Sequence, residues 1–66
     1  MKLQINYPWH LVERGQGFFV PCLDAEPVIQ AGLHKALGYR YFDARAKIGV
    51  KNGVIGVMFY RLPLKI

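Results

Sequence analysis

The sequence is short of the groups that usually hold a small domain together. It contains a single cysteine, Cys22, so no disulfide can form within the chain, and a lone thiol fits a reducing, cytoplasmic environment. Its two histidines, His10 and His34, have no cysteine cluster beside them and do not form a zinc pattern. We therefore expect no metal and no cofactor.

Acidic residues are also scarce. Four Asp and Glu stand against nine Lys and Arg, which gives a net charge of +5. The excess favours a polyanion or an acidic protein surface as a partner, although a small protein can also be basic for solubility alone. Catalysis needs a pair of suitable groups close together. The sequence places none, since Asp43 is expected to form a surface ion pair with Arg40 or Arg45. We predict a protein that is not an enzyme.

Long apolar runs are missing too. No stretch approaches the roughly 18 apolar residues of a membrane-spanning helix, and the first residues alternate polar with apolar, unlike a signal peptide. We expect a cytoplasmic protein without membrane contact. The chain forms a single domain, 1–66, in which residues 1–8 form an N-terminal strand or an extended arm. A domain this small buries only about 60% of its unfolded surface, so a monomer and a homodimer or partner complex both stay open.

The first half of the chain predicts a turn, a strand and a helix. Residues 13–17 are polar and contain two glycines, which indicates a turn, and residues 18–20 form a compact strand ended by Pro21. Trp9 is predicted to anchor the core rather than an interface.

The helix has recognisable ends. Asp24 or Glu26 is expected to cap it, Pro27 fits its first turn, and Gly38 is predicted to follow its last residue. Gly32 costs about 1 kcal/mol against alanine inside a helix, which predicts close packing against a neighbour. The apolar stripe consists of Val28, Ile29, Leu33, Ala36 and Leu37.

Residues 42–61 predict a β-hairpin. Polar and apolar residues alternate on both sides of Asn52-Gly53, and this dipeptide favours a type I′ turn, whose two central residues need positive φ. A two-residue loop fixes the register, so Lys51 faces Val54 and pairing continues from there. With the strand at residues 18–20 beside its second strand, we predict a small α+β domain of β-α-β-β order. It has a three-stranded antiparallel sheet with one helix packed on one face.

The predicted register divides the hairpin into two faces. The first is apolar and is expected to meet the core; it holds Ala46, Ile48, Val50, Ile55, Val57 and Phe59. The second mixes cations with aromatic and aliphatic residues: Arg45, Lys47, Lys51, Val54, Met58 and Tyr60, with Tyr41 one step beyond and Gly49 opposite Gly56 in the middle.

The second face is the candidate functional surface. Cations that neutralise phosphates, next to rings that stack on bases, are typical of proteins that bind single-stranded nucleic acid. A basic ribbon can also enter a duplex groove, and the glycine pair leaves room for a backbone or a phosphate. The alternatives are a protein interface whose rim is covered by lysine stems, and an ordinary solvated surface, against which Met58 and Val54 argue.

Two segments resemble short uncharacterised accessory proteins of bacteriophages. They are the strand segment 15–21, Gly-Gln-Gly-Phe-Phe-Val-Pro, and the hairpin segment 51–61, which begins Lys-Asn-Gly and ends in Arg61. The resemblance covers about two thirds of the chain and implies a phage protein that binds nucleic acid or a host protein, without catalytic residues. The helix is less basic than in those proteins, since it carries only His34 and Lys35, which argues against insertion of the helix into a groove.

Together these observations predict a small, basic, phage-type protein that binds nucleic acid, DNA rather than RNA, in the host cytoplasm. The alternative is an interaction module that binds and inhibits an acidic host enzyme, with a homodimer allowed in either case. The predicted nucleic-acid-binding residues are Arg40, Tyr41, Arg45, Lys47, Lys51, Met58 and Tyr60.

Overall fold

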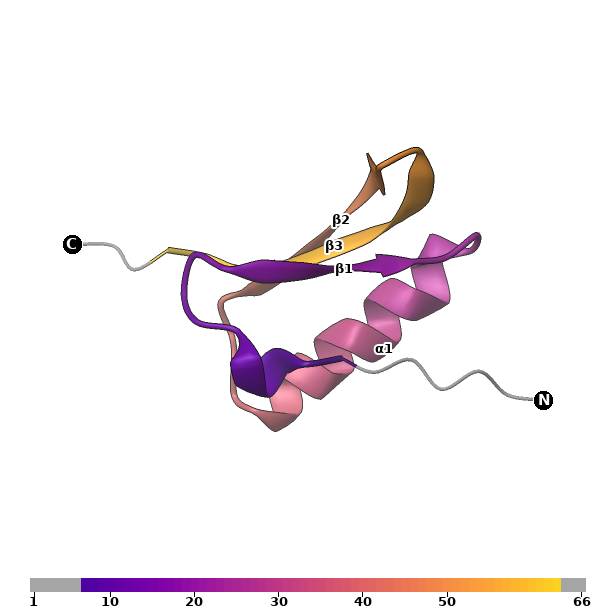
Figure 1. Cartoon of the computed structure of the whole chain (residues 1–66). Helices are drawn as coiled ribbons and strands as arrows, with labels where there is room; N and C mark the ends of the chain where they lie inside the picture. Colours follow the sequence, from indigo (N-terminus) through magenta and orange to yellow (C-terminus); the bar gives the residue numbers. More distant parts are fainter. Residues whose placement is uncertain (1–6, 64–66) are drawn as a thin grey trace.

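Three strands and one α-helix make up the protein in a computed structural model that describes residues 7–63. The predicted N-terminal strand or arm falls mainly on residues 1–6, outside the described residues. The sheet is antiparallel with strand order β1-β3-β2, and α1 lies on one of its faces (Figure 1). This confirms the predicted α+β fold. In chain order the elements are η1 (Trp9–Leu11), β1 (Gly17–Pro21), α1 (Ala25–Gly38), β2 (Ala44–Lys51) and β3 (Val54–Arg61).

The hairpin of β2 and β3 forms around the predicted turn. Asn52 and Gly53 both have positive φ, 53° and 78°, as a type I′ turn requires. Every predicted pair is present, and one more joins Ala44 to Arg61 at the open end. Strand β2 begins at Ala44 rather than at residue 42, because residues 41–43 form a turn in which the Ala44 N–H donates to the Tyr41 carbonyl at 3.2 Å.

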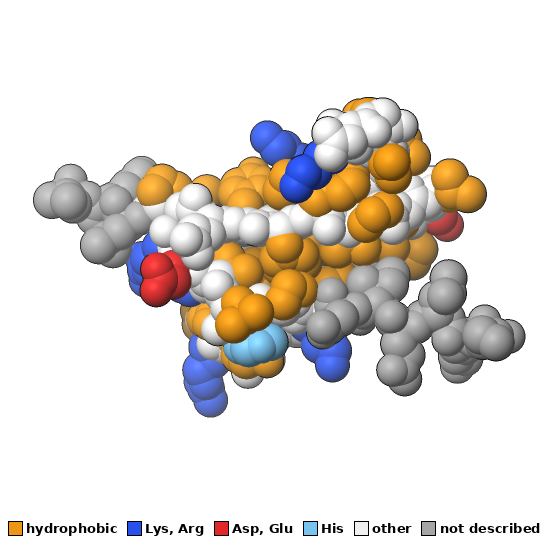
Figure 2. Space-filling model, viewed as in Figure 1, with side chains coloured by type: hydrophobic (Ala, Val, Ile, Leu, Met, Phe, Trp, Pro, Cys, Tyr) orange, Lys and Arg blue, Asp and Glu red, His pale blue; other side chains and the backbone are white. Residues whose placement is uncertain are grey.

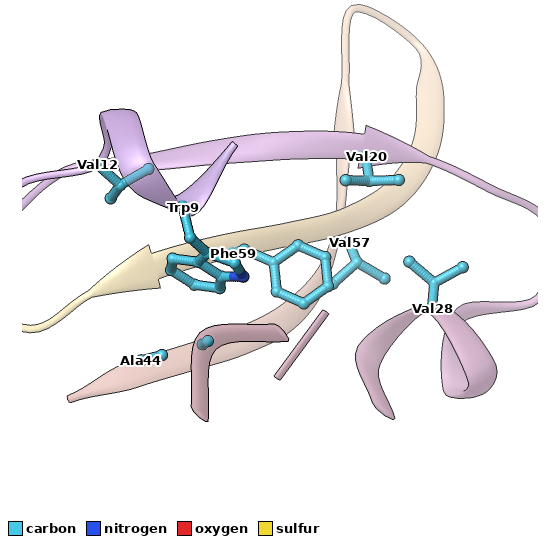
Figure 3. Close-up of a cluster of buried hydrophobic side chains, with 8 residues drawn as sticks. Trp9, Val12, Val20, Val28, Ala44, Val57 and Phe59 are labelled. Atoms are coloured by element: carbon cyan, nitrogen blue, oxygen red, sulfur yellow. The ribbon is translucent and has the colours of Figure 1, made fainter. Parts of the chain in front are cut away.

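Aromatic side chains from separate elements fill the core between the sheet and α1. Trp9 is fully buried, which confirms its predicted role, and its ring meets those of Phe18 and Phe59 edge to face, at 4.9 and 5.8 Å between centroids. Phe59 comes from the central strand and lies next to Trp9 (Figure 3). The buried core consists of Trp9, Val12, Val20, Val28, Ala36, Ala44, Val57 and Phe59.

Gly32 allows the helix to approach the sheet closely. A Cβ atom at this position would overlap the Phe59 ring, so only glycine fits without a shift of the ring or the helix. The Gly32 carbonyl also accepts a buried hydrogen bond from the Trp9 indole N–H at 2.8 Å. The predicted close packing of Gly32 is confirmed, and its partners are Phe59 and Trp9.

The helix ends differently from the prediction. Gly38 is the last helical residue, and the left-handed position two residues later belongs to Arg40, with φ of 61°. The N–H of Arg40 donates to the Leu37 carbonyl and the N–H of Tyr41 to the Ala36 carbonyl, which is the Schellman pattern. Leu37, predicted in the apolar stripe, is 54% exposed because it lies in this last turn.

The apolar face of the hairpin is covered only in part. Val57 and Phe59 are buried as predicted, but Ile48, Val50 and Ile55 are 61%, 68% and 46% exposed. For Val50 and Ile55 the reason is length, since β1 pairs with β3 only as far as Gly56 and the hairpin tip extends beyond that level. Ile48 lies opposite Val57 on the edge strand β2, which has no neighbour on its other side among the described strands. The tip also curves away from α1 (Figure 1).

Gly32→Ala is expected to destabilise the fold. The added methyl group meets a fully buried ring that cannot move aside, and overpacking of this kind costs about 1–3 kcal/mol or more, which outweighs a helix-propensity gain of about 1 kcal/mol. Urea denaturation measures the difference in unfolding free energy.

Gly38→Ala is the matched control for Gly32→Ala. No atom lies within 4 Å of a Cβ at Gly38, and its φ is not positive. This variant is expected to be neutral or more stable by up to about 1 kcal/mol. Equal destabilisation by the two substitutions would contradict the proposed contact between Gly32 and Phe59.

Candidate nucleic-acid interface

The face of the sheet that points away from α1 is called the outer face below. It is formed by alternate residues of all three strands, and the strand registers bring them together. Within residues 7–63, α1 is packed on the opposite face (Figure 1). The outer face consists of Gly17, Phe19 and Pro21 from β1, Arg45, Lys47, Gly49 and Lys51 from β2, and Val54, Gly56, Met58 and Tyr60 from β3.

Two aromatic rings and a methionine occupy the middle of the outer face. Phe19 pairs with Met58, and Tyr60 is the next outer residue of β3, so the three side chains are neighbours. All three are half-buried, which leaves part of each side chain in contact with solvent. Sequence reasoning missed Phe19, because its side of the sheet depends on the register between β1 and β3, which no short turn fixes.

The two glycines at the middle of the hairpin are not equivalent. Gly49 is open, since no atom lies within 4 Å of a Cβ built there. Gly56 is buried, because the Phe19 ring and the backbone of β1 occupy the space beside it. The predicted close approach of another backbone is therefore found at Gly56, where β1 takes the space, while Gly49 stays open. Gly56 also gives the Phe19 ring a place to lie against the sheet.

Cations line the β2 side of the outer face. The Arg45 guanidinium donates to the carbonyls of Phe42 and Ala44 at 3.0 and 2.8 Å, which holds it near the start of β2 beside Tyr60. The Lys47 ammonium lies 5.7 Å from the centre of the Tyr60 ring. Since β1, β2 and β3 contain no Asp or Glu, the charges that these strands contribute to this face are all positive.

Tyr41 does not lie on the outer face. The alternation of β2 begins only at Ala44, and the Tyr41 ring packs against the core, 6.3 Å from Trp9 between centroids. The Arg61 guanidinium lies 3.8 Å above the ring, and Tyr39 stacks on it at 5.6 Å. These contacts hold the half-buried Tyr41 ring against the core, so it does not take its predicted place on the outer face.

Arg40 and Asp43 also differ from expectation. Arg40 belongs to the turn that ends α1, so it lies in the helix layer and not on the outer face. Asp43 pairs with neither Arg40 nor Arg45. Its carboxylate accepts from the Arg61 Nε–H at 3.1 and 3.3 Å, and the same guanidinium donates to the Val12 carbonyl. Both side chains of this ion pair are largely shielded from solvent, so Arg61 acts in stabilising the fold.

The rest of the described chain offers little for other chemistry. Among residues 7–63 there is no group of three His, Cys, Asp or Glu that could hold a metal ion, and no helix is long and apolar enough to cross a membrane. Burial raises the pKa of the Tyr7 hydroxyl above its usual value, and the nearby Cys22 raises it further.

Comparisons with known proteins assign no family to the chain. No protein-family model matches the chain, and neither the curated proteins nor the solved structures contain a match to it.

Arg40→Gly is expected to stabilise the protein by about 1 kcal/mol, because a left-handed φ costs an L-residue about that much and costs glycine nothing. Arg40→Ala is the control, since it removes the same side chain and keeps the unfavourable backbone position. Thermal denaturation compares the two. A gain in the alanine variant as large as in the glycine variant would show that the side chain, and not the backbone, is the cause.

Proposed function

We propose that this protein binds single-stranded nucleic acid on the outer face of its sheet, without catalysing a reaction. The observation that carries the proposal is the composition of that face: aromatic side chains at its centre, cations along one side and no acidic residue from any strand. Arg45, Lys47 and Lys51 contact phosphates, while Phe19 and Tyr60 stack on bases.

The position of the rings supports stacking. Phe19 and Tyr60 lie on neighbouring strands and are diagonal neighbours on the same face. The α-carbons of such residues are about 7–8 Å apart. Both rings are anchored in the sheet on one side and reach solvent on the other, so they lose little conformational freedom when a base binds. Stacking on such rings is worth about 1–3 kcal/mol per base and tolerates any base, because each base has an aromatic face.

The position of the cations supports a defined path for the phosphates. Arg45, Lys47 and Lys51 follow one another along β2, all on the outer side and all exposed. A strand laid along β2 therefore meets positive charge at three of the four outer positions, with its bases directed toward β3 and β1. Open Gly49 lies between Lys47 and Lys51 and allows the nucleic-acid backbone to approach the sheet.

The proposal keeps three of the sequence-based candidates as phosphate contacts and two, Met58 and Tyr60, in the apolar centre. It adds Phe19 and omits Arg40 and Tyr41. Taken with the resemblance to phage accessory proteins, it describes a small phage-type protein acting on nucleic acid in the host cytoplasm, with DNA favoured as the ligand. Inhibition of a host enzyme remains the competing hypothesis, and the binding experiment separates the two.

Binding of a fluorescent 12-nucleotide oligothymidylate, followed by anisotropy, tests the proposal. We expect micromolar affinity at about 50 mM salt, falling roughly twentyfold at about 200 mM, since three phosphate contacts to a single strand give a logarithmic slope of about −2. Tyr60→Leu and Phe19→Leu keep the apolar packing but remove the ring, and each is expected to weaken binding about fivefold or more. The same sequence as RNA and as duplex tests the ligand preference.

The control variants change residues in the helix layer, away from the outer face of the sheet. Tyr39→Leu removes an exposed ring and Lys35→Gln an exposed cation, and both belong to the helix or to the turn that ends it. Neither is expected to change affinity, whereas Lys47→Gln is expected to weaken binding and reduce the salt slope. The proposal would be contradicted if no oligonucleotide binds at about 50 mM salt, or if the control variants lose as much affinity as the outer-face variants.

A further inference from the structure

A second exposed surface lies at the hairpin tip, on the side opposite the outer face, and it is aliphatic where the outer face is basic and aromatic. Its members are large aliphatic residues on the α1 side of the hairpin and in the loop before α1. We call it the tip patch; it consists of Ile48, Val50, Ile55 and Leu23. Figure 2 shows hydrophobic side chains gathered over the hairpin end of the sheet.

The four residues form one continuous surface. Val50 pairs directly with Ile55, and Ile48 is the next residue of β2 on the same side. The Cys22 N–H donates to the Ile55 carbonyl at 3.2 Å, which holds the loop against β3, and Leu23 and Ile55 line the same hollow. Leu23 is 96% exposed, so the described residues leave it almost uncovered.

The size of the tip patch is suited to a two-fold interface. Four aliphatic side chains exposed in this way make a patch of a few hundred Å², the size at which exposed apolar surface marks an interaction site. Doubled across a two-fold axis, and with its polar rim included, it approaches the roughly 1,000 Å² that a specific interface needs. A chain of 66 residues whose described part buries only eight core residues also has little stability of its own, and pairing adds buried surface.

The charges around the tip patch favour a second copy over an acidic partner. Asp24, directly after Leu23, and Glu26, two residues further on, are two of the four acids in the chain, and both are exposed. These two carboxylates would repel an acidic partner at the patch. An acidic protein would instead be attracted to the outer face, where β1, β2 and β3 contribute only positive charge.

The same charges argue against edge-to-edge pairing. The free edge of β2 carries Arg45, Lys47 and Lys51, and antiparallel pairing of two such edges would bring like charges together. Packing of the two tip patches face to face avoids this contact, because the three cations point to the outer side of the sheet.

We propose that the tip patch is the interface of a homodimer in which two hairpins pack face to face through Ile48, Val50 and Ile55, with Leu23 at the edge. The interface is isologous, since the same patch serves both copies. It leaves both outer faces free and is independent of what they bind.

Sedimentation velocity of the full chain, from about 5 to about 500 µM, tests the proposal. We expect a monomer–dimer equilibrium with a micromolar dissociation constant. Val50→Lys places a charge in the interface and is expected to weaken the dimer at least about tenfold. Val50 is exposed in the single chain, so this substitution does not enter the core.

Leu37→Lys is the control. Leu37 is also an exposed aliphatic residue, but it lies in the last turn of α1, at the end of the helix away from Leu23, and the substitution adds the same charge. It is expected to leave the dimer unchanged, with circular dichroism showing that both variants are folded. A monomer at the highest concentration, or equal weakening by the two substitutions, would overturn the proposal and leave the patch to a different protein.

Discussion

The contact of Phe59 with Gly32 determines how closely the helix can approach the sheet. Because Gly32 has no side chain, the Phe59 ring lies against the backbone of α1. The Trp9 indole then donates to the carbonyl of the same residue, so one position of the helix holds both the central strand and the segment before β1. Three parts of the chain that lie far apart in sequence meet at this point, and the remaining core residues pack around it.

A single helix held in this way can cover only part of the sheet, and this limit produces both candidate surfaces. Among residues 7–63 nothing packs over the outer face, because α1 lies on the other side, and the hairpin tip is left uncovered because it extends beyond the level at which β1 ends (Figure 1). The two surfaces differ in chemistry. One joins aromatic rings with positive charge, which suits phosphates and bases. The other is aliphatic with two exposed acids beside it, which suits a second copy. We propose that the chain binds its ligand and pairs with itself on these two separate surfaces.

Features set by neighbouring residues could be predicted from the sequence. Asn52-Gly53 encodes its own turn, which fixes the hairpin register and hence the sides on which Arg45, Lys47 and Tyr60 lie. Features that depend on distant parts of the chain were missed. Phe19 joins the outer face through the register of β1, and Tyr41 packs instead against Trp9 and Arg61, both of which lie far from it in sequence. The Asp43–Arg61 ion pair likewise joins residues whose proximity no local pattern indicates.

The hairpin, the helix and the positive charge of β2 are determined by the sequence itself, since each follows from spacing, turn chemistry or composition over a few residues. The tertiary structure decided which apolar residues are core and which are surface. Val57 and Ile55 are equally apolar and lie on the same side of β3, yet the first is fully buried and the second is half exposed. The difference arises because α1 and β1 cover Val57 but end before Ile55. Where a packed helix or strand ends relative to its neighbours is decided only when the whole fold is assembled.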